Sequence, residues 1–292
     1  PTQRTFSIYE KKKKKYEEHI EELKTFINKS TETADGKKVM LAANIGGADE
    51  AAKAVKAGAE GVGLFRTEFL FLNKNALPTE EEQFEEYKKA AVLTKGMPLT
   101  IRTLDIGGDK DIPYMGLTKE TNPFLGYRAI RFCLDRVDIF TTQLRAILRA
   151  SAYGSIRIMI PMITSVNEVR QVKDMIKKIC SDLDHNGISY DKNIQTGVMI
   201  ETPAAAIMAD AIAQEVDFFS IGTNDLTQYT IAVDRCNENV AYLYSAFNPA
   251  VLRLIRRIIE CAHNAGIEAG MCGEAAGIFV GVVGRSSAES VA

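Results

Sequence analysis

Seven short apolar runs recur along the chain, and most of the gaps between them hold an amphipathic helical pattern. Apolar runs of this kind, with few charges, are typical of strands buried on both faces of a parallel sheet. The runs are Val39–Ala43, Gly61–Phe65, Leu99–Leu104, Ile156–Ile163, Thr196–Ile200, Phe218–Ile221 and Ile267–Cys272. Seven strand-then-helix units in one chain predict an α/β fold of the (β/α)8 TIM-barrel type.

A charged amphipathic segment precedes these units. From Phe6 to about Asn28, the apolar residues recur at steps of three and four, so one face of a long helix is apolar and needs a surface to lie against. These residues are Tyr16, Ile20, Leu23 and Ile27. The five lysines from Lys11 to Lys15 are interpreted as a solvated helix face in preference to an anion-binding patch. We therefore expect an N-terminal helix or linker over residues 1–36 and a barrel over residues 37–292.

The end of the chain does not fit a complete barrel. A barrel of this type needs an eighth strand, yet only 15 residues follow Gly277. They hold one short apolar run, Ile278–Val283. Either this run closes the barrel in an unusual way, or the chain is truncated or altered after Gly277, which is the interpretation we favour.

Composition limits the partners and the compartment. The formal net charge of -2, from 36 basic and 38 acidic residues, gives no reason to expect nucleic acid or a membrane surface as a partner. The five cysteines are odd in number and contain no Cys-x-x-Cys pair, which argues against a disulfide framework and a zinc site. No apolar run approaches the roughly 18 residues of a membrane helix, and no signal-peptide pattern is visible. We expect a cytoplasmic protein.

Two carboxylates follow neighbouring strand candidates. Glu201 comes after the run that ends at Ile200, and Asp225 comes shortly after the run that ends at Ile221. Carboxylates at adjacent strand ends suit a magnesium ion that keeps several waters and shares the remaining positions with a phosphorylated substrate. The alternative is that both carboxylates only cap the helices that follow.

Several arginines also fall near strand ends, namely Arg66, Arg102 and Arg235. Planar guanidinium groups match phosphate oxygens, so three on one rim predict a bound phosphoryl group, although lone arginines are more often surface salt-bridge partners. Arg128, in NPFLGYRAIR, is a weaker candidate for the same site and could equally be a helix-surface charge. Lys110 follows a glycine pair and is a further possible positive charge, or the glycines simply permit a tight turn.

Two other side chains sit beside these groups. Asn224 precedes Asp225, where its amide could donate to a phosphate or carboxylate oxygen, or its side chain could shape the loop as an Asx-turn. Cys272 ends the seventh strand, and a thiol at a barrel mouth can give or take a proton, although most cysteines are small buried hydrophobes. The three histidines, His19, His185 and His263, lie in polar helical or turn contexts and are expected at the surface.

Six ordered motifs closely resemble the C-terminal, phosphoenolpyruvate-binding domain of Enzyme I, the phosphoenolpyruvate-protein phosphotransferase family of the bacterial sugar phosphotransferase system. The resemblance extends from about Val39 to Gly277. The motifs are GLFRTEFLF, IRTLDIGGDK, NPFLGYRAIR, MIETPAAA, FFSIGTNDLTQYTIAVDR and GMCGEAAG.

This resemblance implies roles for the site residues. Glu201 and Asp225 hold Mg²⁺, whereas Arg66, Arg102, Asn224, Asp225 and Arg235 bind phosphoenolpyruvate, with Arg128 nearby. Cys272 is the acid that protonates the methylene carbon as pyruvate forms. The resemblance also implies a homodimer, and a histidine on a separate N-terminal domain that accepts the phosphoryl group and passes it to the histidine-containing phosphocarrier protein for sugar uptake. The acceptor segment of that domain occurs nowhere in this sequence.

Three alternatives to this interpretation remain. The chain could be a binding and dimerisation module without activity of its own, or a barrel of the pyruvate phosphate dikinase and phosphoenolpyruvate synthase type. A magnesium-dependent carbon–carbon lyase also uses a paired Glu and Asp, but the arginine set is richer than a small keto acid needs.

Overall fold

Seven strands and eleven α-helices alternate along the part of the chain that the computed structural model describes, which is residues 3–25, 27, 31–33, 36–72, 74–107, 113–116 and 120–274. The strands are β1 (Ala42–Ile45), β2 (Gly61–Arg66), β3 (Leu99–Arg102), β4 (Ile156–Ile160), β5 (Gln195–Ile200), β6 (Phe218–Gly222) and β7 (Glu268–Cys272).

The eleven α-helices comprise α1, which precedes β1, and ten that fill every gap between consecutive strands. They are α1 (Gln3–Lys24), α2 (Ala48–Lys56), α3 (Glu68–Leu72), α4 (Glu80–Leu93), α5 (Ile130–Asp135), α6 (Val137–Ala150), α7 (Val166–His185), α8 (Pro203–Ile207), α9 (Ala209–Ile212), α10 (Thr223–Ile231) and α11 (Pro249–Ala265). Short 3₁₀ turns lie at Pro113–Met115, Pro123–Leu125, Ser151–Tyr153 and Ala241–Leu243.

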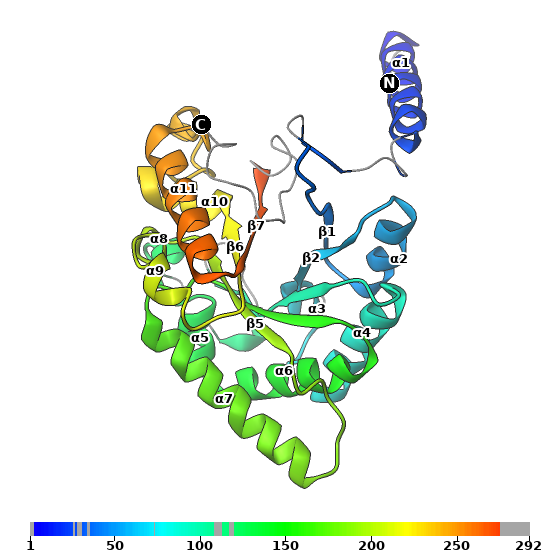
Figure 1. Ribbon diagram of the computed structural model, residues 1–292. Coiled ribbons are helices and arrows are strands. Elements are labelled where there is room, and N and C mark those ends of the chain that lie inside the picture. The colour runs from blue at the N-terminus through cyan, green and yellow to red at the C-terminus, as the bar shows by residue number, and fades with distance from the viewer. Residues whose placement is uncertain are drawn as a thin grey trace.

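All seven strands are parallel, and their order in the sheet follows the order of the sequence from β1 to β7. The sheet curls so that the helices α2 to α11 lie outside it, as Figure 1 shows. Within the described residues, β1 and β7 are the two edges of this curl. The predicted barrel-type fold is confirmed, and no eighth strand lies in the described part of the chain.

The seven predicted strands are all present, but some bounds differ. The fourth run was expected to continue to Ile163, whereas β4 ends at Ile160. Pro161 has no N–H for the sheet ladder, and Met162 adopts a positive φ of 60°, so the backbone turns away. The residues stay buried, which is why their apolar character resembled a longer strand.

Apolar side chains form two separate cores. The larger one lies between the convex face of the sheet and the helices, and includes Phe65, Ile101, Ile158 and Phe219. A small second cluster inside the curl consists of Leu64, Met159, Met199 and Phe218, with Cys272 packed against it. This alternation of outward and inward side chains is what a curled parallel sheet requires. The inner cluster forms the floor beneath the strand ends.

Helix starts follow the signals in the sequence. Thr79 with Glu82, and Ser165 with Glu168, form complete capping boxes at the starts of α4 and α7. At α11, the Asn248 side chain accepts from the backbone N–H of Ala250, and proline occupies the first turn. These caps fix where the long helices begin and therefore how long the connecting loops are.

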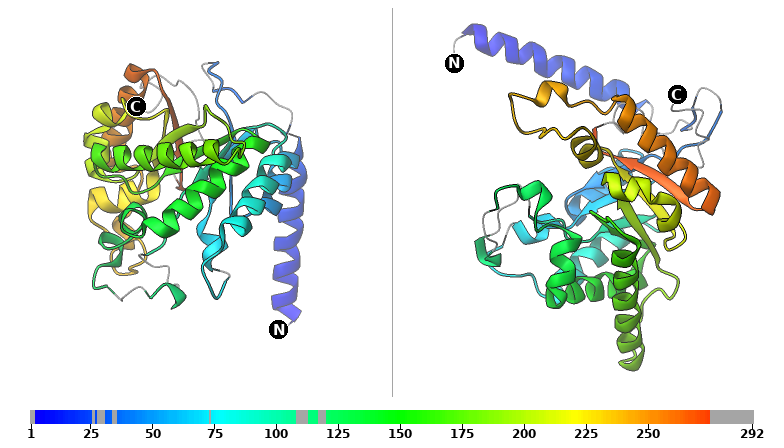
Figure 2. Two further views of the ribbon diagram at one scale, coloured as in Figure 1. Left: turned by 90° about the horizontal axis from the view of Figure 1, so that it is seen from below. Right: turned by 90° about the vertical axis from the view of Figure 1, so that its left-hand side faces the viewer.

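The N-terminal helix differs from its expectation in where it lies. Helix α1 is present, but it projects away from the curled sheet in Figures 1 and 2. Its Tyr16 is 65% exposed, so the surface that this face was expected to need is not supplied by the described barrel. Gly108, Lys110 and the run Ile278–Val283 lie outside the described residues. The division at residue 36 stays a prediction. Among the described helices, none combines the length and apolar character needed to cross a membrane.

Candidate functional site

One cavity of about 360 Å³ lies at the carboxyl ends of the strands, and eight of the side chains that the sequence predicted for the site line it. The side chains come from the ends of five strands and from the segments that follow them, because parallel strands bring those ends to one rim. They are Arg66, Arg102, Arg128, Glu201, Asn224, Asp225, Arg235 and Cys272. Lys110 lies outside the described residues.

Glu201 does not cap the helix that follows it. The side chain of Thr202 caps α8 by accepting from the backbone N–H of Ala205. Glu201 is buried, and its Oε1 accepts a 2.7 Å hydrogen bond from the backbone N–H of Met162. Burial, followed by the charges of Asp225 and Asp105, raises the pKa of Glu201 from 4.5 to about 8. A cation bound beside the Glu201 carboxyl would therefore favour its ionised form.

The backbone around Glu201 leaves little spare room. A Cβ atom at Gly222 would lie 2.6 Å from Glu201 Oε2, so β6 can pass this carboxylate only with a glycine there. The strained positive φ of Met162 aims its N–H at the same side chain from β4. The conformation of Glu201 is thus set from both neighbouring strands.

Asp225 lies in the first turn of α10 and is buried between two arginines. Arg128 Nη2 lies 3.1 Å from Asp225 Oδ2, and Arg235 Nη1 lies 3.2 Å from Asp225 Oδ1. Arg128 also donates to Asp105, at 2.9 and 3.1 Å to its two oxygens. Arg128, the weaker candidate from sequence, is therefore a buried centre of the site and not a helix-surface charge.

Two carboxylates of the site were not predicted. Glu68 Oε1 accepts a 2.7 Å hydrogen bond from Arg102 Nη2, and Asp105 Oδ2 lies 3.2 Å from Arg102 Nη1. Both acids are buried and line the same cavity as Arg102. Their position in the sequence could have identified them, since each follows a predicted strand by only a few residues. Among the described residues, four arginines and four carboxylates thus line the cavity.

Arg66 differs from the other arginines. Its guanidinium carbon lies 4.6 Å from the centre of the Phe69 ring. No carboxylate in the described part of the chain lies within 4.0 Å of it, and its Nε is buried without a hydrogen-bond partner there. A cation in this state, directed into a cavity, is a candidate anion ligand.

Asn224 ties the end of β7 to the start of α10. Its Oδ1 accepts a 2.8 Å hydrogen bond from the backbone N–H of Glu274. Between them, Gly273 has a φ of 102°, and a Cβ atom there would lie 2.4 Å from Thr223 Oγ1. The carbonyl oxygen of Asn224 is therefore used in shaping this loop, though not as an Asx-turn. Its amide nitrogen donates no hydrogen bond within the described part of the rim.

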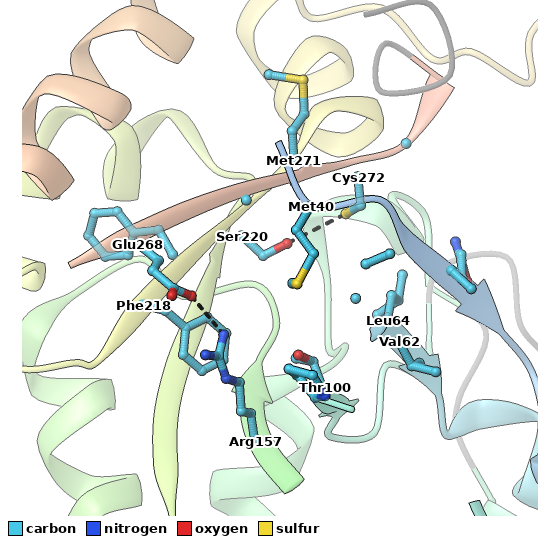
Figure 3. A pocket seen from close by; sticks show the side chains of 18 residues that line it. Met40, Val62, Leu64, Thr100, Arg157, Phe218, Ser220, Glu268, Met271 and Cys272 are labelled. Atoms are coloured by element: carbon cyan, nitrogen blue, oxygen red, sulfur yellow. Dashed lines mark hydrogen bonds and ion pairs between the residues drawn. The ribbon is translucent and has the colours of Figure 1, made fainter. Parts of the chain in front are cut away.

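Cys272 lies at the junction of two cavities. A second cavity of about 260 Å³ occupies the amino-terminal half of the curl, and Figure 3 shows Cys272 beside Ser220 at one end of it. The Arg157–Glu268 ion pair lies at the other end, at 2.8 Å. Burial raises the pKa of the Cys272 thiol to about 11. The thiol therefore stays protonated at neutral pH and can donate a proton.

The other cysteines and the histidines stay away from this rim. Cys133, Cys180 and Cys261 lie in helices, and Cys236 is exposed. His19 and His185 are exposed, while His263 is partly buried in α11 and so lies deeper than expected. None of the three histidines lines either cavity.

The acid groups of the cavity suit a magnesium ion that keeps some of its water ligands. The described residues contain no cluster of three or more His, Cys, Asp or Glu side chains arranged as a complete protein cage. Mg²⁺ in phosphoryl-transfer sites uses one or two carboxylates and takes its other ligands from water and substrate. The Glu201 and Asp225 pair, with the raised pKa of Glu201, fits that type of site.

The family assignment follows from comparison with known proteins. Residues 20–282 match the family model of the PEP-utilising enzyme, PEP-binding domain. The chain belongs to the phosphoenolpyruvate-utilising enzymes. The resemblance that the six motifs carry is thereby confirmed.

Curated relatives in this family of phosphoenolpyruvate-utilising enzymes are close in sequence. The phosphoenolpyruvate-protein phosphotransferases of Priestia megaterium and Bacillus subtilis are 52% and 51% identical over 95% of the chain. That of Geobacillus stearothermophilus is 53% identical. The chain spans 48–49% of these proteins, about half of their length.

Among solved structures, a HpcH/HpaI aldolase/citrate lyase family protein from Burkholderia cenocepacia superimposes with a TM-score of 0.51. It is 13% identical, and the match covers 88% of this chain and 86% of that protein. At this identity, the likeness concerns the curled parallel fold alone.

Proposed function

We propose that this chain is the phosphoenolpyruvate- and Mg²⁺-binding barrel of an Enzyme I-type phosphotransferase. In this proposal the phosphoryl group leaves phosphoenolpyruvate for a histidine on an N-terminal domain, and pyruvate is released. The single observation that carries the proposal is the convergence of Arg66, Arg102, Arg235, Glu201, Asp225 and Cys272 on one cavity.

The balance of charges in the cavity supports joint binding of an anionic substrate and a cation. The buried arginines Arg102 and Arg128 already have acids beside them, so the protein alone offers little net positive charge. Arg66 supplies a guanidinium without an acid in the described contacts. Phosphoenolpyruvate carries a phosphate and a carboxylate, and therefore needs both the arginines and added positive charge.

Glu201 and Asp225 are the proposed protein ligands of Mg²⁺. When bound, the ion neutralises charge on the transferring phosphoryl group and its oxygens. Arg66, Arg102 and Arg235 orient the phosphate and carboxylate, with the amide nitrogen of Asn224 as a further donor. Most of the barrier reduction then comes from position and electrostatics fixed before the substrate arrives.

Cys272 is the proposed acid for the carbon atom. As the bridging P–O bond breaks, the phosphoryl group forms a bond to the acceptor histidine and the enolate of pyruvate remains. The Cys272 S–H then gives its proton to the methylene carbon, which becomes the methyl group, and the thiolate is left to be reprotonated. The raised pKa of Cys272 supports this direction, because the thiol enters the step protonated.

The whole protein would do more than this chain. By analogy with its relatives, the phosphorylated histidine would pass its phosphoryl group to a histidine-containing phosphocarrier protein for sugar uptake. A homodimer formed through the barrel belongs to the same proposal, as does a cytoplasmic location. The passive binding module and the dikinase- or synthase-like barrel are the alternatives that the experiments below separate.

Calorimetry tests the binding part. Phosphoenolpyruvate should bind the chain in the presence of Mg²⁺, and Glu201→Gln or Asp225→Asn should abolish the magnesium-dependent part of that binding. Asp174→Asn, an exposed acid on α7, is the matched control. Unchanged phosphoenolpyruvate affinity in either site variant would contradict the assignment.

Isotope exchange and reconstitution test the chemistry. Incubation with pyruvate and Mg²⁺ in deuterated water should exchange the methyl protons in a Cys272-dependent way, whereas binding without exchange would favour the passive module. Adding a histidine-bearing N-terminal domain from a relative should produce pyruvate from phosphoenolpyruvate. Pyruvate formation without that domain would argue against phosphotransfer to it.

A further inference from the structure

A glutamine outside the cavity is buried at the carboxyl ends of two strands. Gln143 projects from α6 and is fully shielded from solvent. Its Oε1 accepts a 2.8 Å hydrogen bond from the backbone N–H of Leu104. Its Nε2 donates to Thr67 Oγ1 at 3.1 Å and to Tyr87 OH at 3.3 Å. Both amide N–H donors and one lone pair of the amide oxygen are thus directed to the segments after β2 and β3 and to α4.

These contacts lead directly to site residues. Thr67 Oγ1 donates a 2.9 Å hydrogen bond to the carbonyl oxygen of Arg102. The next residue, Glu68, binds the guanidinium of the same arginine. Leu104 immediately precedes Asp105, which pairs with both Arg102 and Arg128. Gln143 therefore joins the two chain segments that carry Arg66, Glu68, Arg102 and Asp105.

The network continues outward to the start of α4. Tyr87 OH donates to Gln83 Oε1 at 3.2 Å, and Gln83 Nε2 donates to the carbonyl oxygen of Pro78 at 3.1 Å. Tyr87 and Gln83 are both buried. Fully satisfied buried networks rigidify a structure, whereas a partly satisfied one is costly. Gln143 is the member that contacts both strand-end segments.

We propose that Gln143 is a positioning residue for the proposed phosphoenolpyruvate site. It fixes the distance between the carboxyl ends of β2 and β3. Through Thr67 and Leu104, it also sets where the Arg102 guanidinium and the Asp105 carboxylate lie. This inference rests on the proposed function, because its consequence is measured on phosphoenolpyruvate. Displacements on the order of 1 Å are enough to weaken such a site by large factors.

The test compares two equivalent substitutions in the full chain. Gln143→Met keeps the length of the side chain but removes all three hydrogen bonds, and should weaken phosphoenolpyruvate binding with Mg²⁺ by about tenfold or more, as second-layer changes do at metal sites. Gln83→Met is the matched control, since it is equally buried but separated from the strand ends by Tyr87. It should change affinity by no more than about twofold. Equal effects of the two substitutions would overturn the proposal.

A second variant guards against loss of folding. Tyr87→Phe removes one hydroxyl and leaves the contacts of Gln143 to Thr67 and Leu104 in place, so affinity should fall less than in Gln143→Met. All affinities are measured well below the unfolding transition of each variant. If Gln143→Met does not fold, Thr67→Val takes its place, because it removes the hydrogen bonds of Thr67 Oγ1 with Gln143 and with the Arg102 carbonyl oxygen. Unchanged affinity in Thr67→Val overturns the proposal, and a loss of about tenfold supports it.

A double-variant cycle separates positioning from a general loss of stability. The loss caused by Gln143→Met should shrink to about twofold in an Arg102→Lys background, because the arginine that it positions is no longer there. A full tenfold loss in both backgrounds would show that Gln143 does not act through Arg102. Failure of the unaltered chain to bind phosphoenolpyruvate would instead overturn the proposed function, whereas normal binding with no effect of Gln143→Met overturns this inference alone.

Discussion

Arg128 Nη2 lies 3.1 Å from Asp225 Oδ2, so an arginine from the segment after β3 neutralises a carboxylate in the first turn of α10. The same nitrogen lies 2.9 Å from Asp105 Oδ1. One buried guanidinium thereby holds together two acids that would otherwise repel each other across the cavity.

We expect Arg128→Met to lower the free energy of unfolding by about 3 kcal/mol, because it leaves two buried acids without their shared cation. Mg²⁺ should then stabilise the variant more than it stabilises the unaltered chain. Thermal unfolding with and without Mg²⁺ measures both effects. Arg136→Met, which changes a partly exposed arginine beside Asp138, is the control and should cost less than about 0.5 kcal/mol. A loss equal to that of the control would contradict the role of Arg128.

The pKa of Glu201 predicts a pH dependence of stability. The folded-state pKa of about 8 lies above the ordinary value of 4.5, so the folded chain holds a proton that the unfolded chain has released. The stabilisation is complete below about pH 4.5 and is lost as the pH rises through 8. The metal-free chain should thus lose on the order of 5 kcal/mol over this range through Glu201.

Denaturant unfolding at a series of pH values tests this dependence. Glu201→Gln cannot ionise, so the variant should lack this part of the decline. Saturating Mg²⁺ should also remove it, because the cation favours the ionised carboxylate. Parallel pH profiles for Glu201→Gln and the unaltered chain would rule out this assignment.

Cys272→Ala should separate binding from proton transfer. We expect phosphoenolpyruvate affinity within about threefold of the original and a loss of pyruvate methyl exchange of at least about 100-fold, as for removal of a general acid. Proton exchange by NMR and calorimetry measure the two quantities. Cys236→Ala, which changes an exposed cysteine, should leave both unchanged. Undiminished exchange in Cys272→Ala would assign the proton to another group.

Gly273→Ala should damage the site through backbone geometry. The φ of 102° and a Cβ contact of 2.4 Å to Thr223 Oγ1 both oppose a side chain there. We expect a loss of about 2 to 3 kcal/mol in stability and slower methyl exchange, because Cys272 is the preceding residue. Gly266→Ala, with a φ of 75° and no atom within 4 Å of its Cβ position, should cost about 1 kcal/mol and leave exchange unchanged. Similar losses for both variants would mean that the Thr223 contact has no importance.

The sequence predicted the strands because burial on both faces leaves a readable apolar run, and it predicted their ends less well. Val39 and Met40 were assigned to the first strand, whereas pairing with β2 begins at Ala42. The run after Ile160 is equally apolar, but the backbone of Pro161 and Met162 cannot continue the ladder. An apolar run shows that a segment is buried, but it does not show where hydrogen-bond pairing between strands begins or ends.

The position of residues at the carboxyl ends of predicted strands identified eight side chains that line one cavity. It did not identify the residues that pair with them. Glu68 and Asp105 stand within motifs that were interpreted through their arginines. Gln143 had a usable signal, since it lies on the same helical face as Ile139, Leu144 and Ile147, where a polar residue is out of place. The left-handed backbone of Met162 has no counterpart in sequence, because methionine rarely adopts it.

The ion pairs of Arg102 and Arg128 have a consequence for selectivity. Because these guanidinium groups already rest against Glu68, Asp105 and Asp225, an incoming anion must replace or share carboxylate contacts and does not simply fill empty ones. A singly charged anion, such as chloride or acetate, should therefore bind weakly. A multiply charged anion that contacts several of these groups at once, together with a metal ion, can offset the loss of the carboxylate contacts.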